Sequence, residues 1–170
     1  APDWRREDWR RDMSTADAPV ARAPELSGPA PRILAISAPY YRQVVDGMLE
    51  AARQILTQVD AELVVQEVSG AYELPQALSI AAAAAQKFDG YILLGCVVRG
   101  ETDHYEFICA SAMDGLMRVA TEQVLCVGTA LLTVDTLAQA VARSHETGSN
   151  KGAEAAVACL KQIALKRALA

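Results

Sequence analysis

Residues 91–104 read YILLGCVVRGETDH, and this stretch says more about the fold than any other part of the chain. The apolar run from Tyr91 to Val98 predicts a strand that is buried on both faces. The run stops at a charged residue and a glycine, and the pattern then favours a helix with His104 in its first turn. A strand, a glycine-containing turn and a helix N-terminus gather free backbone N–H groups that bind anions.

His104 gives this predicted anion site a chemical role. Histidine is the side chain that moves protons near neutral pH, and here it would lie beside the bound anion. The same residues admit a plainer interpretation, in which Arg99 caps the strand and His104 is a polar residue on a helix surface. Residues 91–104 alone do not separate these two interpretations.

Outward from this stretch, predicted strands and helices alternate along the chain. The other predicted strands are 33–36, 62–68 and 124–132. Helices are expected between Val45 and Leu56, from Pro75 to about Gln86, over 103–122, from Asp135 as its cap to Arg143, and from Asn150 onward. This order predicts an α/β protein with a three-layer, doubly wound, flavodoxin-like sheet of four parallel strands flanked by helices.

Composition excludes several classes of protein. The net charge is −5, spread along 170 residues, which argues against a nucleic-acid partner, and no apolar run reaches membrane-spanning length. The four cysteines lie in apolar surroundings without metal-ligand spacing, so we expect buried thiols in a reducing cytoplasm and no metal site. They are Cys96, Cys109, Cys126 and Cys159.

Residues 1–31 differ from the rest of the chain, and we expect them to form a flexible N-terminal extension to a domain over 32–170. Asp3–Glu7 and Asp8–Asp12 form a tandem repeat with one tryptophan in each copy, and a proline-containing segment follows. The repeat either docks on a partner through its tryptophans or is a loose tail. Met13 offers an alternative start.

A ligand site is expected where the parallel strands end, outside their carboxyl edge. Tyr40 and Tyr72 follow two of the predicted strands and would flank one crevice, with Glu73 beside them. Alternatively, each tyrosine covers the edge of the core. The sequence has no glycine-rich dinucleotide motif, phosphate-binding Walker loop, nucleophile elbow or carboxylate cluster for Mg²⁺. The predicted chemistry is therefore proton transfer, without a cofactor, around an anionic substrate.

Three motifs resemble the lumazine synthase family. They are residues 69–75 (SGAYELP), 95–104 (GCVVRGETDH) and 150–156 (NKGAEAA), and the resemblance covers about 31–169. It implies the penultimate reaction of riboflavin biosynthesis. There, 5-amino-6-(D-ribitylamino)uracil and 3,4-dihydroxy-2-butanone 4-phosphate give 6,7-dimethyl-8-ribityllumazine, phosphate and water, with no cofactor.

The resemblance also implies the site residues. His104 would transfer protons, and Arg143 would reach the phosphate from a neighbouring subunit, since the family forms homopentamers and, in some members, capsids of twelve pentamers. The helix around Ala110, Met113, Leu116 and Met117 would line the centre of such a ring or belong to the core of one chain. The other implied contacts are Tyr40, Ala71, Tyr72, Glu73, Val97 and Val98 for the pyrimidine and ribityl groups, and Gly100, Glu101 and Thr102 for the phosphate.

The chain departs from the family pattern at four positions. Pro39, Ser69, Thr129 and Thr147 replace a common arginine, proline, phenylalanine and lysine, respectively. Two of these changes remove a cation and an aromatic side chain from the implied site. They leave open the alternative that this protein is a weakly active paralogue, which either binds riboflavin or lumazine or forms a shell.

Overall fold

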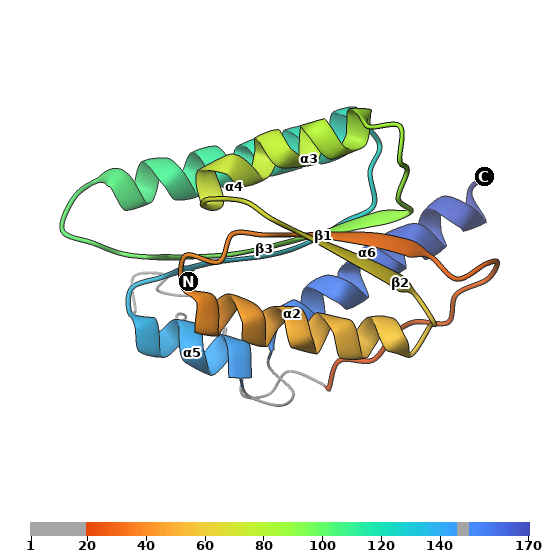
Figure 1. Ribbon diagram of the computed structural model, residues 1–170, viewed down its shortest axis with the longest axis horizontal. Coiled ribbons are helices and arrows are strands. Elements are labelled where there is room, and N and C mark those ends of the chain that lie inside the picture. Colours follow the sequence, from red (N-terminus) through yellow and green to blue (C-terminus); the bar gives the residue numbers. More distant parts are fainter. Residues whose placement is uncertain (1–19, 146–149) are drawn as a thin grey trace, which may run out of the picture.

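A computed structural model describes residues 20–145 and 150–170. In this part of the chain, four parallel strands form one sheet in the order β2-β1-β3-β4 (Figure 1). The strands are β1 (Arg32–Ser37), β2 (Glu62–Glu67), β3 (Gly90–Val98) and β4 (Val127–Val134). The predicted three-layer α/β fold is confirmed.

Helices cover both faces of the sheet. One face carries the short 3-10 helix η2 (Ala71–Glu73) with α3 (Leu74–Ala83) and α4 (His104–Glu122). The other face carries α2 (Arg42–Thr57), α5 (Leu137–His145) and α6 (Lys151–Ala168) (Figure 1). None of these helices combines the length and hydropathy that crossing a lipid bilayer requires.

The sheet separates two apolar cores, which explains the continuous apolar runs in the sequence. Successive residues of a strand point to opposite faces. In β1, Ile33 therefore packs with the helices α2 and α6, whereas its neighbour Leu34 packs with α3 and α4. In β3, Ile92 and Leu93 divide in the same way, and both are fully buried.

The ends of three elements differ from the sequence-based expectation. β4 begins at Val127 rather than at residue 124, because Val124 has a positive φ of 53° and the chain is still leaving α4. The helix α3 ends at Ala83, short of Gln86. Asp135 was expected to cap α5, but the hydroxyl of Thr136 accepts the hydrogen bond from the N–H of Gln139 (3.2 Å).

Residues 20–31 lie against α2 and α6 without regular secondary structure. Arg167 donates to the backbone O of Ser27 (2.6 Å), and the N–H of Ala23 donates to Gln58 Oε1 (2.9 Å). Leu26 packs against the core on this face of the sheet. The tryptophan repeat and Met13 lie outside the described residues.

Candidate active site

The predicted pyrimidine-binding residues lie at the carboxyl edge of the sheet, on the left in Figure 1. The strand order places the loop after β1 between the loops that follow β2 and β3. Tyr40 precedes α2 and is 78% exposed, with its ring edge-on to that of Tyr41 at 5.1 Å. Tyr72 is 61% exposed and lies in η2, which contacts both α4 and β3. Both rings are therefore available to a ligand.

The other predicted ring contacts come from η2 and from the end of β3. Ala71 and Val97 pack against the core under α3 and α4, whereas Val98 packs against the core on the opposite face. Glu73 is exposed beside Tyr72. The structure thus brings three separate sequence segments to one edge, because the strands that precede them are parallel neighbours.

The predicted phosphate-binding residues form the 100–103 turn, which joins β3 to α4. All four of its residues are exposed, and an added Cβ on Gly100 would have no heavy atom within 4 Å. Among the described residues, no backbone N–H of this turn has a hydrogen-bond partner. The turn therefore offers free N–H groups and open space at a helix N-terminus, as an anion site requires.

His104 is the first residue of α4 and follows this turn directly. Its side chain is exposed, and its backbone N–H lies 3.4 Å from Thr102 Oγ1. Asp103 ends the turn and its carbonyl accepts hydrogen bonds from the N–H groups of Glu106 and Phe107. This first helical turn fixes the backbone of His104 next to the open N–H groups.

Arg143 lies apart from these residues, along the outer edge of β4. It lines a hollow of about 250 Å³ together with residues 129–134 and Lys151. Its guanidinium donates to the carbonyl of Gln139 (2.9 Å), one turn earlier in α5. The hollow includes none of the other predicted site residues, but it does include the substituted position Thr129. Thr147 lies outside the described residues.

Lys151 is a candidate site residue that sequence reasoning missed. Its Nζ forms an ion pair with Glu154 (2.7 Å), and it stands beside Arg143 at the β4 edge. The motif at 150–156 carries the family resemblance, but its pattern alone gives the lysine no role. A cation directly after a helix-capping asparagine was the available signal, because the cap fixes where that cation stands.

Asn150 holds the two cation-bearing helices together. Its Oδ1 accepts from the N–H groups of Gly152 (2.8 Å) and Ala153, capping α6. Its Nδ2 donates to the carbonyls of Ser144, at the end of α5, and Gly47 in α2. One side chain therefore sets the positions of Arg143 and Lys151 relative to the sheet.

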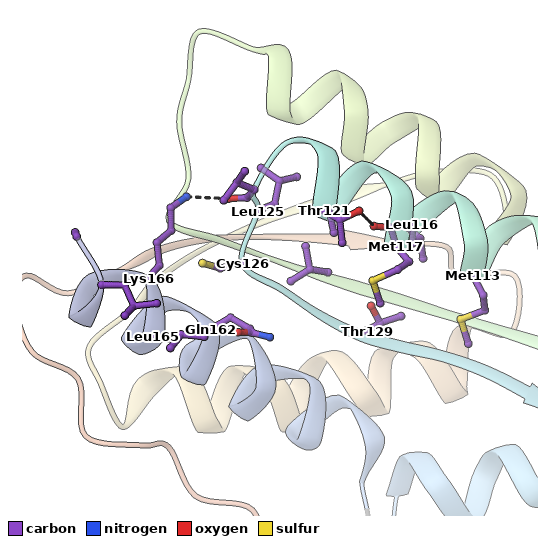
Figure 2. A pocket seen from close by; sticks show the side chains of 15 residues that line it. Met113, Leu116, Met117, Thr121, Leu125, Cys126, Thr129, Gln162, Leu165 and Lys166 are labelled. Carbon is purple, nitrogen blue, oxygen red and sulfur yellow. Dashed lines mark hydrogen bonds between the residues drawn. The ribbon is translucent and has the colours of Figure 1, made fainter.

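A larger apolar groove lies between α4 and α6, over the edge of β4 (Figure 2). Its volume is about 850 Å³, and its lining includes Met113, Met117 and Leu165. Of the helix residues expected at a ring centre, Leu116 is a core residue at 3% exposure, whereas Met113 and Met117 are 41% and 64% exposed. The groove offers apolar contact area but none of the predicted catalytic groups.

The thiols have environments that suppress reactivity. Burial raises the pKa of Cys96 to about 11 and that of Cys159 to about 12, so both remain protonated at neutral pH. All four cysteines are free, and among the described residues no three His, Cys, Asp or Glu side chains gather as a metal site would require.

Fold and site together define a doubly wound α/β protein that has an open turn with free backbone N–H groups, and exposed aromatic side chains, at the carboxyl edge of its sheet. Residues 30–167 match the family described as 6,7-dimethyl-8-ribityllumazine synthase. The chain therefore belongs to that family.

Three relatives carry the name 6,7-dimethyl-8-ribityllumazine synthase. The protein of Methylorubrum populi is 39% identical over 81% of this chain and 83% of its own length. That of Paramagnetospirillum magneticum is 37% identical over 81% of this chain and 96% of its own. That of Bartonella tribocorum is 36% identical over 81% of this chain and 91% of its own length.

Proposed function

We propose that this protein condenses 5-amino-6-(D-ribitylamino)uracil with 3,4-dihydroxy-2-butanone 4-phosphate to form 6,7-dimethyl-8-ribityllumazine in riboflavin biosynthesis. Family membership over residues 30–167 carries the proposal. The arrangement of the site supports it, since the open 100–103 turn, His104 and the exposed rings of Tyr40 and Tyr72 all lie at the carboxyl edge of the sheet.

The reaction needs proton transfers and an anion site. The amine of the pyrimidine adds to the ketone, water leaves to form an imine, and phosphate is then eliminated. Ring closure through the ribitylamino nitrogen releases a second water. His104 is proposed to carry the protons, while the 100–103 turn and an arginine hold the phosphate as it becomes a leaving group.

Purified protein is expected to convert the two substrates to a fluorescent lumazine without added metal or nucleotide, and with EDTA present. The assay follows product fluorescence, with each substrate omitted in turn as the control. No lumazine from fresh substrates, together with tight binding of riboflavin or a lumazine analogue, would instead establish a binding protein. Loss of activity with EDTA would contradict the proposed independence from cofactors.

The position of Arg143 supports a site that is shared between subunits. Arg143 faces the outer edge of β4, where Thr129 and Thr133 are exposed and no described strand pairs. The apolar groove beside this edge offers contact area for a second copy (Figure 2). We therefore propose a closed homo-oligomer, a five-membered ring, in which Arg143 completes the site of the adjacent subunit.

Arg143→Ala should raise the KM for the phosphorylated substrate much more than the KM for the pyrimidine, because a guanidinium matches phosphate geometry.

Co-assembly of Arg143→Ala subunits with His104→Ala subunits tests directly whether the site is shared between subunits. In a random equal mixture, about a quarter of shared sites recover both residues, and activity returns to that extent. Native mass spectrometry reports the ring size. A fully active monomer, or no recovery in proven mixed rings, would contradict the shared site.

A further inference from the structure

Arg99 connects three elements at the end of β3. Its Nε donates to Asp135 Oδ1 (2.9 Å) after β4, and its Nη1 donates to Glu106 Oε1 (2.8 Å) in the first turn of α4. The guanidinium also lies over the ring of Tyr105, with its Cζ 4.3 Å from the ring centroid. Its backbone N–H donates to the carbonyl of Val134 (2.8 Å).

These contacts lie at the two ends of the 100–103 turn. Arg99 immediately precedes the turn, and Tyr105 and Glu106 lie just beyond His104 at its other end. Asp135 is itself anchored, because its backbone N–H donates to Gln139 Oε1 in α5 (2.9 Å). The same guanidinium therefore holds both ends of a turn that has no backbone hydrogen bonds of its own among the described residues.

We propose that Arg99 is a positioning residue for the reaction: it fixes the 100–103 turn and His104 in the geometry that receives the phosphorylated substrate. This inference rests on the proposed function of that site. Arg99 acts through the turn rather than by binding the phosphate, because its Nε and Nη1 groups already bind the carboxylates of Asp135 and Glu106. The two carboxylates more than offset its single positive charge, so the three groups together offer the site no net positive charge.

Planarity explains why an arginine is needed here. A guanidinium presents several N–H groups in a fixed plane, so it can bridge two carboxylates and stack on a ring at the same time. A lysine carries the same charge on a flexible stem and cannot hold all three partners in one geometry. Charge and positioning can therefore be separated by comparing Arg99→Met with Arg99→Lys.

The experiment measures kcat, both KM values and the affinity for inorganic phosphate by calorimetry. Arg99→Met is expected to lower kcat roughly tenfold, because small displacements of reacting groups are costly. It should also raise the KM for the phosphorylated substrate, and the dissociation constant for inorganic phosphate, by a similar factor. The KM for the pyrimidine should stay within about twofold, since the turn does not hold that ring. Arg99→Lys should resemble Arg99→Met. The control is Arg53→Met, whose partner Glu50 lies on the same helix, and it should match the wild type.

Three results would overturn this role. Wild-type behaviour of Arg99→Lys would mean that charge alone matters, and wild-type behaviour of Arg99→Met would remove Arg99 altogether. A lower unfolding temperature with unchanged kcat and KM would mean that Arg99 only stabilises the fold. If the wild type itself forms no lumazine, the proposed function fails, yet phosphate calorimetry on Arg99→Met still tests the positioning of the turn.

Discussion

His104→Ala should lower kcat roughly a hundredfold, within bounds of about ten- to a thousandfold, while the protein stays folded. The proposed reaction transfers protons at imine formation, phosphate loss and ring closure. His104 is the histidine at the N-terminus of α4, directly after the open 100–103 turn. Its side chain is exposed and outside both cores, so its removal leaves the packing intact. Steady-state lumazine formation and circular dichroism check the two halves of this prediction.

The chain contains a matched control for this variant. Its second histidine, His145, is also exposed but ends α5, away from the turn. His145→Ala should therefore retain wild-type kcat. If His104→Ala shows unchanged kinetics with both substrates, His104 has no part in the mechanism, and the proton transfers must be assigned to another group or to water.

Gly152→Ala should cost roughly 3 kcal/mol of folding free energy or more, because α6 would be pushed away from α2. A Cβ at Gly152 would lie 1.9 Å from the carbonyl oxygen of Met48, against a practical lower limit of 3.0 Å. Intrinsic helix propensity predicts the opposite sign, since alanine is favoured over glycine by about 1 kcal/mol inside a helix. Gly128→Ala should behave alike, since its Cβ would meet the carbonyl of Ala155 at 1.8 Å.

Thermal or denaturant unfolding measures this effect, with Gly100→Ala as the control. Gly100 has no heavy atom within 4 Å of an added Cβ, so its unfolding midpoint should stay near that of the wild type. A Gly152→Ala protein as stable as the wild type would show that α2 and α6 do not meet as described. Since Lys151 adjoins Gly152, the destabilised variant should also lose activity.

The elements with the strongest sequence patterns were predicted correctly, for a physical reason. Residues 91–98 are apolar at every position, as a strand between two cores requires, and the structure places them in β3 at the centre of the sheet. The ends were less predictable, because local polar groups decide them. Asp135 has the side chain of a helix cap, but Arg99 binds it, and the cap is Thr136.

By itself, the sequence determined the strand and helix order, and hence that the loops after β1, β2 and β3 share one edge, because parallel strands align their carboxyl ends. Its motifs also indicated the family. Only the tertiary structure decided which side chains meet across that edge, because such contacts join residues far apart in the chain. The pairing of Arg99 with Asp135, the placement of Arg143 beside Lys151 on the outer side of β4, and the contact of Gly152 with Met48 each depend on how helices pack on the sheet. No local pattern encodes that packing.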